Sequence, residues 1–508
     1  MHLLIDTNIF IYPEDDRIVS QNVSDLFGLL QEIPVDIFIH PSSVADIQRD
    51  TDTRRQKIML SKIGIYKQLP SPPNAAVDKK FLEIVGNPSS PQDSVDNEIL
   101  YAVVRGAADF LLTEDAGIHK KAFLVGINER VFHIDDALEY FKNFLPRKDK
   151  IYPPPALKEE FMHNLDLSDP FFDSLKQEYP RVGNSPEFTE WFQRKVRKDH
   201  GKCFVSYQSH GRIGALLIKK IENEAIEGSR PYQPKKRRLK ISLLKVTDIR
   251  HKIGELLLKL SFDSAIQNDI DEIYLTHFSK PDDRLVSLIE EYGFVKTAVN
   301  ERGEDIFIKK LIPDDPKLIE RNPLQIYRIF YPTFYDGLAV KKWIIPIRPE
   351  FHERLFTDVI RRQTTLEEQA GGFIVEGNAI KKAYLCRAPT KQLSEGDVVL
   401  FYRSVDQSAI TSVGVIEKVR TGINDTDEIL RMVGKRTVYS PDEIEKFEKP
   451  LVVILFRHIC HLKHPIELQL LQKLKLLKTA PMTINKIPDD TYKIIKDIGG
   501  INGRFTVN

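Results

Sequence analysis

A proline-rich stretch at 145–160, "LPRKDKIYPPPALKEE", is the strongest constraint on how this chain can fold. Proline has no backbone N–H and a fixed φ, so this stretch cannot continue a helix or enter a central strand. A second expected linker, "IPDDPKLIERNPLQ" at 312–325, separates a strand-like run from a new apolar segment. Because 508 residues at roughly 150 per domain suggest three domains, we expect domains at 1–145, 165–312 and 340–508.

Composition limits the class of protein. The chain has 74 Lys and Arg against 73 Asp and Glu, so binding to nucleic acid would rest on local basic patches. Its three cysteines are far apart, which supports neither a disulfide framework nor a zinc ribbon and favours a reducing compartment. No apolar run approaches a membrane span, and Asp6 interrupts the first apolar stretch. We therefore expect a cytoplasmic protein with no membrane partner, and a homo-oligomer is left open.

Four aspartates in the first domain stand at comparable positions. Strand-like runs in residues 1–145 alternate with helix-like stretches, which predicts βαβ units and a parallel sheet. Sites in such sheets gather at the carboxyl ends of the strands. Asp6 ends the first apolar run, and Asp115 follows "FLLTE". Asp46 lies a turn into the helix expected after "VDIFIH", and Asp96 begins the helix expected at "DSVDNEILYAVVRGA".

Each of these acids alone has an ordinary explanation. Asp6 could be a turn former after a strand, Asp96 could favour a helix macrodipole, and Asp115 could cap the helix at "AGIHKKA". Four acids at one sheet edge are harder to explain in this way, because crowded like charges raise one another's pKa unless a cation neutralises them. A magnesium or manganese site would resolve the conflict.

The pieces "LLIDTNIFI", "SSVADI", "DNEILYAVVRGA" and "FLLTEDAGI" resemble the PIN-domain nucleases over nearly all of residues 1–145. The resemblance implies a parallel α/β/α sandwich and places Asp6, Asp96 and Asp115 on the metal-binding aspartates of that family. Asp46 falls where the family more often has Glu, so its catalytic role is less secure. The implied activity is that of a metal-dependent endoribonuclease, in which water activated on Mg²⁺ or Mn²⁺ hydrolyses a phosphodiester.

The sequence predicts a mixed α+β domain over residues 165–312. From "LKISLLKVTDI" to "EDIFIKKL" the expected order of elements is strand, helix, strand, helix, strand, strand. The pieces "VTDIRHKIGELLL" and "LIEEYGFV" resemble a GNAT-type N-acetyltransferase. That resemblance implies acetyl-CoA binding through backbone N–H groups at the turn before the long helix. The residues of this implied site are Val246, Arg250, His251, Lys252, Ile253 and Gly254.

The middle domain also departs from the family pattern. Lys252 stands where the family has its first glycine, and Ile289 stands where the family often has a Tyr that protonates the departing thiolate. Tyr292 sits beside the glycine of "GF" instead and also fits a core position. His277, just after an expected strand, is a candidate catalytic general base if its pKa is near neutrality, although a lone His is more often structural.

The third domain, from about 340 onward, is strand-rich, which predicts a small barrel or sandwich. The stretch "NAIKKAYLCRAPTKQLSEGDVVLFYRS" with "GVIEKV" resembles the ASCH branch of the PUA-like domains and implies a β-barrel linked to RNA. Alternating basic and aromatic residues suit RNA contact, but they equally suit a core strand with one solvated face. The candidate phosphate contacts are Lys381, Lys382 and Arg403, together with Lys235, Lys236, Arg237 and Arg238 in the "KKRRLK" loop of the middle domain.

These patterns together predict a multi-domain enzyme that acts on RNA. It would combine a metal-dependent ribonuclease, an acetyl-CoA-dependent N-acetyltransferase and an RNA-reading domain, with Mg²⁺ or Mn²⁺ and acetyl-CoA as cofactors. Two alternatives stay open: a protein N-acetyltransferase, and a non-catalytic RNA-binding regulator that retains the folds. The sequence identifies neither the RNA nor the acyl acceptor.

Overall fold

A computed structural model gives the fold. It describes residues 1–10, 17–49, 51–145, 157–181, 187–199, 201–208, 211–247, 253–281, 283–314, 323–356, 380–388 and 392–508. The chain divides into two compact units, each assembled from separate segments. Unit 1 comprises Met1–Lys150, Pro281–Ser287 and Gly422–Val453, and unit 2 comprises Ile151–Lys280, Leu288–Thr421 and Ile454–Asn508. The three domains expected along the sequence stay a prediction.

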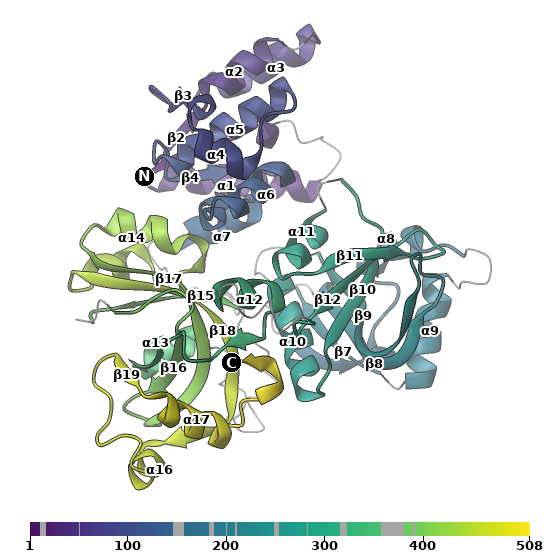
Figure 1. Ribbon diagram of the computed structural model, residues 1–508. Helices are drawn as coiled ribbons and strands as arrows, with labels where there is room; N and C mark the ends of the chain where they lie inside the picture. Colours follow the sequence, from purple (N-terminus) through teal and green to yellow (C-terminus); the bar gives the residue numbers. More distant parts are fainter. Residues whose placement is uncertain are drawn as a thin grey trace. The chain divides into compact units, whose positions relative to one another are not determined.

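Unit 1 contains a five-stranded sheet in the order β3-β2-β1-β4-β5 (Figure 1). All four neighbouring pairs are parallel, which confirms the parallel sheet predicted for residues 1–145. The likeness to PIN-domain nucleases in particular stays a prediction. The strands are β1 (His2–Ile5), β2 (Asp36–Ile39), β3 (Lys67–Gln68), β4 (Phe110–Leu112) and β5 (Val131–Phe132).

Helices cover both faces of this sheet. Successive residues of a strand point to opposite faces, and accordingly Leu3 and Ile5 pack in one core cluster while Leu4 packs in another. The first cluster is completed by α1 (Arg17–Glu32), α2 (Pro41–Gln48), α3 (Thr53–Ile63) and α7 (Ile134–Lys142). The second is completed by α4 (Lys79–Val85), α5 (Pro91–Val104) and α6 (Ala116–Leu124).

The segment Gly422–Val453 joins unit 1 from far along the chain. It carries α14 (Thr426–Val433) and α15 (Pro441–Lys446). Its basic side chains pair with acids of the N-terminal segment, so sequence-distant parts complete one folded unit. The pairs are Arg431 with Asp109 at 2.9 Å, Lys435 with Asp136 at 3.0 Å and Arg436 with Glu129 at 3.0 Å.

Unit 2 contains a seven-stranded sheet in the order β11-β12-β10-β9-β8-β7-β6. β9 and β10 pair in parallel, and the remaining pairs are antiparallel. The predicted succession of strands and helices is confirmed. The elements are β6 (Leu157–Phe161), α8 (Asp173–Glu178), α9 (Phe188–Asp199), β7 (Lys202–Tyr207), β8 (Ile213–Ile226), β9 (Gln233–Val246), α10 (Ile253–Gln267), β10 (Glu272–His277), α11 (Arg284–Glu291), β11 (Val295–Val299) and β12 (Asp305–Lys310). The first half of α11, up to Ser287, belongs to unit 1.

The second large sheet of unit 2 corrects the barrel prediction. Its six strands run in the order β15-β18-β17-β16-β14-β19, and no described strand joins the edges β15 and β19. The strand-rich runs themselves are confirmed. They are β14 (Lys342–Ile347), β15 (Lys381–Cys386), β16 (Val398–Arg403), β17 (Ala409–Ile423), β18 (Leu451–Glu467) and β19 (Asn485–Ile487). Around them lie α12 (Pro323–Phe330), α13 (Pro349–Leu355), α16 (Leu468–Lys473), α17 (Asp489–Ile498) and the pair β13 (Phe334–Tyr335) and β20 (Thr506–Val507).

Two further observations concern the whole described chain. Among the described helices, none has both the length and the hydrophobicity that crossing a bilayer requires. Cys203, Cys386 and Cys460, all among the described residues, form no disulfide.

Candidate functional site

The carboxyl ends of β1 and β4 open onto a pocket of about 520 Å³ in unit 1, which we call the acid pocket. Asp6 directly follows β1, and Asp115 stands between β4 and α6. Asp96 reaches the pocket from α5 and Asp46 from α2. All four acids singled out in the sequence therefore line one pocket. The elements responsible are parallel strands, whose carboxyl ends lie at one edge of the sheet.

Asp6 is the most buried of these acids, with 5% of its surface exposed. One carboxylate oxygen accepts a 2.7 Å hydrogen bond from the Thr113 hydroxyl. Burial raises the pKa of Asp6 to about 6; repulsion from Asp115 adds to this rise, and the Thr113 hydrogen bond opposes it. Asp6 thus keeps its proton into the weakly acidic range.

Asp96 has a still higher pKa. Burial, followed by repulsion from Asp115 and Asp6, raises its pKa to about 7. The amide of Gln92 donates a hydrogen bond of 3.4 Å to its carboxylate. The expected mutual repulsion among these carboxylates is present, although burial is the larger cause of both shifts.

Asp115 and Asp46 each have a structural partner. Asp115 accepts a 2.8 Å hydrogen bond from the Ile118 backbone N–H and so caps α6, as the ordinary explanation of this residue anticipated. One carboxylate oxygen can cap a helix while the other stays available as a ligand. Asp46 forms an ion pair of 3.0 Å with Arg49, which neutralises it locally. Asp46 is therefore the weakest metal-ligand candidate of the four.

The donor set fits a hard divalent cation. Mg²⁺ and Mn²⁺ prefer carboxylate oxygens, and Asp6, Asp96 and Asp115 supply three carboxylates to one pocket. Within the described ranges, no three His, Cys, Asp or Glu side chains already lie close enough to hold a metal as they stand. Binding would require the carboxylates to draw together, which their repulsion opposes until a cation is present.

The structure adds a residue to which the sequence argument gave no role. Thr113 is fully buried, and its hydroxyl bonds three groups of the acid pocket. It donates to Asp6, accepts from the Asn8 amide at 3.1 Å and accepts from the Asp115 backbone N–H at 3.1 Å. The available signal was its place in "FLLTED", two residues before Asp115.

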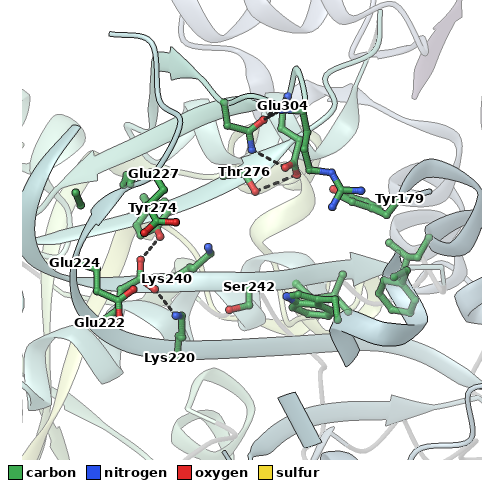
Figure 2. A pocket seen from close by; sticks show the side chains of 18 residues that line it. Tyr179, Lys220, Glu222, Glu224, Glu227, Lys240, Ser242, Tyr274, Thr276 and Glu304 are labelled. Carbon is green, nitrogen blue, oxygen red and sulfur yellow. Dashed lines mark hydrogen bonds and ion pairs between the residues drawn. The ribbon is translucent and has the colours of Figure 1, made fainter. Parts of the chain in front are cut away.

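A second pocket, of about 280 Å³, lies on one face of the seven-stranded sheet in unit 2, and we call it the sheet pocket (Figure 2). Alternate residues of a strand share a face, and three adjacent strands contribute residues two apart to the lining. Other lining residues come from α8, α9 and the β11–β12 connection. The alternating strand contributions are Lys220, Glu222 and Glu224 from β8, Lys240 and Ser242 from β9, and Tyr274 and Thr276 from β10; Ala225 and Ile226 of β8 and Leu243 of β9 also line the pocket.

The implied acetyl-CoA residues are only partly described. Val246 ends β9, while Ile253 and Gly254 begin α10. A side chain at Gly254 would bring a Cβ to 2.9 Å from Leu288, so close packing against α11 is a second reason for a glycine here, and its role in acetyl-CoA binding stays a prediction. The turn residues between them, Arg250, His251 and Lys252, lie outside the described residues.

Two further candidates of the middle domain do not reach the sheet pocket. His277 follows Thr276 on β10, so the alternation of the strand places it on the opposite face, and it is absent from the lining. His277 therefore does not belong to the sheet pocket, and its role as a general base stays a prediction. Tyr292 is fully buried, and burial raises its pKa well above the ordinary value. It is the core residue that the sequence allowed.

The candidate phosphate contacts of the third domain are buried. Lys381 is paired with Glu291, and Arg403 is paired with Asp406 and Glu353. Lys382 lies over the ring of Phe356 at 5.6 Å. These three residues are at most 7% exposed, so they do not offer charge to a phosphate in this conformation. This corrects their assignment as surface contacts.

The "KKRRLK" run is not a loop but part of β9. As a strand it presents its basic side chains alternately to two sides. Lys236 and Arg238 pair with Glu272 at 2.5 and 2.8 Å, and Arg238 is buried. Lys235 and Arg237 are exposed. Only this exposed pair stays a candidate for phosphate contact.

No family model and no curated protein matches this sequence. Among solved structures, ASCH from Zymomonas mobilis is 15% identical and covers 31% of this chain and 95% of its own, with a TM-score of 0.24. Naa20 from Chaetomium thermophilum, in complex with a bisubstrate analogue, is 16% identical and covers 30% and 83%, with a TM-score of 0.22. Arylalkylamine N-acetyltransferase 2 from Aedes aegypti is 14% identical and covers 31% and 99%, with a TM-score of 0.22. Each likeness spans less than a third of this chain, and scores this low establish neither a family nor an activity.

Proposed function

We propose that the acid pocket of unit 1 hydrolyses phosphodiester bonds in RNA with the help of Mg²⁺ or Mn²⁺. One observation carries the proposal: Asp6, Asp96 and Asp115, from three separate elements, line one pocket, and the pKa values of two of them are raised. Carboxylates gathered in this way, with no ion pair to these three among the described residues, suit a divalent ion. RNA as the substrate class comes from the resemblance of residues 1–145 to PIN-domain nucleases.

In this mechanism Asp6, Asp96 and Asp115 would hold the ion, which when bound supplies a Lewis acid and an activated water. Thr113 fixes the Asp6 carboxylate through its 2.7 Å hydrogen bond and ties it to the Asp115 backbone. Asp6 and Asp96 must release their protons before they can act as ligands. Because their pKa values are about 6 and about 7, we expect activity to increase across this range.

The test is cleavage of single-stranded and structured RNA by the full chain with Mn²⁺, compared with Asp6→Asn, Asp96→Asn and Asp115→Asn. Each variant should lose at least about a hundredfold in rate, because each removes a proposed ligand. Asp36→Asn is the matched control, since Asp36 is exposed and paired only with Lys67 at 3.5 Å. Equal cleavage by the wild type and the three variants would rule out the proposal.

A second candidate function, acyl transfer, concerns the sheet pocket of unit 2. The observation in its favour is that Lys240 and Ser242 of β9 line this pocket, and β9 leads directly into the turn implied for acetyl-CoA. The acetyl group would move from the thioester sulfur to an amine nitrogen, releasing the CoA thiol and one proton. Incubating the full chain with labelled acetyl-CoA and primary amines tests it. Label that stays in acetyl-CoA with every amine would reject it.

A further inference from the structure

The inner wall of the sheet pocket holds a buried carboxylate, Glu304, that forms no ion pair with a described residue, although Lys240 of the same lining interacts with it electrostatically. Glu304 is 5% exposed and accepts hydrogen bonds from the Thr276 hydroxyl at 3.0 Å and the Asn300 amide at 2.6 Å (Figure 2). Both donors are neutral, and the described part of the chain contains no ion pair of Glu304. A buried charge is normally paired, because burial removes its hydration. Glu304 therefore creates a place for a cation.

The rim of the same pocket adds two more acids. Glu224 and Glu227 are exposed, and neither forms an ion pair with any other described residue. Glu222, between rim and wall, differs because Lys220 pairs with it at 2.5 Å and Tyr274 donates a hydrogen bond to it. Among the described residues, the pocket thus has one carboxylate without an ion pair inside and two at its mouth.

The rest of the lining suits an aliphatic stem and a polar group. Tyr179, Phe188 and Trp191 provide aromatic walls, and ligand pockets combine such walls with a few placed polar groups. The hydroxyl of Ser242 is buried in the lining without a hydrogen-bond partner. Burial lowers the pKa of Lys240 while Glu222 and Glu304 act in the opposite direction, and Arg302 adds a further positive charge to the lining.

We infer that the sheet pocket binds an aliphatic amine with at least two ammonium groups, one at Glu304 and another at Glu224 and Glu227. A volume of about 280 Å³ suits a small molecule and not a folded surface. The inference deepens the acyl-transfer proposal, because it names the class of acyl acceptor. Only the acetylation of the bound amine rests on that proposal. Binding can be measured without any acyl donor.

The test is calorimetric titration of the full chain with spermidine, with butylamine and with neutral 1-butanol. Spermidine should bind at least tenfold more tightly than butylamine, and butanol should give no heat. Glu304→Gln should weaken both amines, because Gln keeps the hydrogen-bond acceptor but removes the charge. The double variant Glu224→Gln/Glu227→Gln should weaken spermidine alone and bring it to the affinity of butylamine.

Glu301→Gln is the matched control, because Glu301 is exposed, lies on the same β11–β12 connection and does not line the pocket. Should Glu304→Gln fail to fold, the double variant Glu224→Gln/Glu227→Gln, which changes only exposed side chains, still tests whether the pocket binds a second ammonium group. No heat with either amine, equal affinity for spermidine and butylamine, or unchanged affinity in the rim variant would overturn the inference. Tighter binding of a dibasic peptide than of spermidine would overturn the small-molecule assignment.

The experiments distinguish failure of the amine-binding inference from failure of the acyl-transfer proposal. Spermidine binding without transfer of labelled acetyl groups would reject acyl transfer and keep the amine site. Transfer to a monoamine with no preference for spermidine would keep acyl transfer and reject the two-charge site.

Discussion

Thr113 at the end of β4 donates a 2.7 Å hydrogen bond to Asp6 at the end of β1, across two adjacent parallel strands. This bond holds the pKa of Asp6 below the value that burial would otherwise impose. The hydroxyl therefore sets how readily Asp6 becomes a carboxylate ligand.

Replacing Thr113 with Val keeps the shape of the side chain and removes that bond. The pKa of Asp6 should then rise above about 6, and the pH at which Mn²⁺ begins to stabilise the protein should move up by roughly one unit. The measurement is the metal-induced shift in melting temperature between about pH 5 and about pH 8. Identical pH profiles for Thr113→Val and wild type would show that Asp6 does not take part in metal binding.

Asp96→Asn should stabilise the metal-free protein at high pH. The folded state holds the Asp96 proton with a pKa of about 7, against 3.8 for an ordinary Asp. The stabilisation that the folded state gains by holding this proton is fully present below pH 3.8 and is lost as the pH rises through about 7. At about pH 8 we expect the variant to gain about 2 kcal/mol in free energy of unfolding, after allowing for solvent screening.

Urea unfolding at two pH values measures this effect. The gain of Asp96→Asn should shrink as the pH falls to about 5, and added Mn²⁺ should stabilise the wild type more than the variant. A variant that is less stable than the wild type at both pH values would contradict the raised pKa.

Arg284→Met should destabilise unit 1. The Arg284 guanidinium pairs with Glu114 at 2.6 Å and Asp135 at 2.7 Å, and both carboxylates are largely buried. Burial alone would raise the pKa of Glu114, but His133 and Arg284 bring it down to about 2. Loss of the guanidinium leaves two buried acids short of a partner, and we expect a loss of about 2 kcal/mol at neutral pH.

The control for this change is Lys67→Met, since the ion pair of Lys67 with Asp36 is exposed on both sides. It should change the free energy of unfolding by less than about 0.5 kcal/mol. Equal urea midpoints for the two variants would show that Arg284 contributes no more than a surface charge.

Two double variants of the basic strand β9 should lose different properties, RNA binding in one and stability in the other. Lys235→Ala/Arg237→Ala removes the exposed pair, so the log–log salt slope of single-stranded RNA binding should flatten by about 1.4 while stability is kept. Lys236→Ala/Arg238→Ala should instead lower stability, because Glu272 is buried and loses both partners. Filter binding over a salt series, together with thermal unfolding, separates the two. An unchanged slope in the first variant would remove β9 from RNA binding.

The sequence predicted the parts of the fold that local pattern controls. Apolar runs located the parallel strands of unit 1, and Asp6, Asp46, Asp96 and Asp115 reached one pocket because each lies at or near a strand end or helix start. Closure of the third-domain sheet was not predictable in this way, since it depends on strand tilt and register and not on where strands occur.

The burial of charged side chains was the other feature that could not be predicted from the sequence. Lys381 and Arg403 looked like surface contacts because their partners, Glu291, Glu353 and Asp406, become neighbours only in the folded chain. Glu304 was missed for the same reason, because its hydrogen-bond donors Thr276 and Asn300, and its lack of an ion pair among the described residues, are features of the folded chain. Pairing of distant side chains leaves no periodic signal in a sequence.

The discontinuity of unit 1 has a consequence for its biosynthesis. The N-terminal 150 residues are translated first, but the segment Gly422–Val453 that supplies Arg431, Lys435 and Arg436 follows only after most of unit 2. At about 5 to 20 residues per second, the early segment waits on the order of tens of seconds for these partners. Unit 1 therefore gains these three ion pairs only late in synthesis, and a messenger truncated before this segment would yield an acid-pocket unit that lacks them.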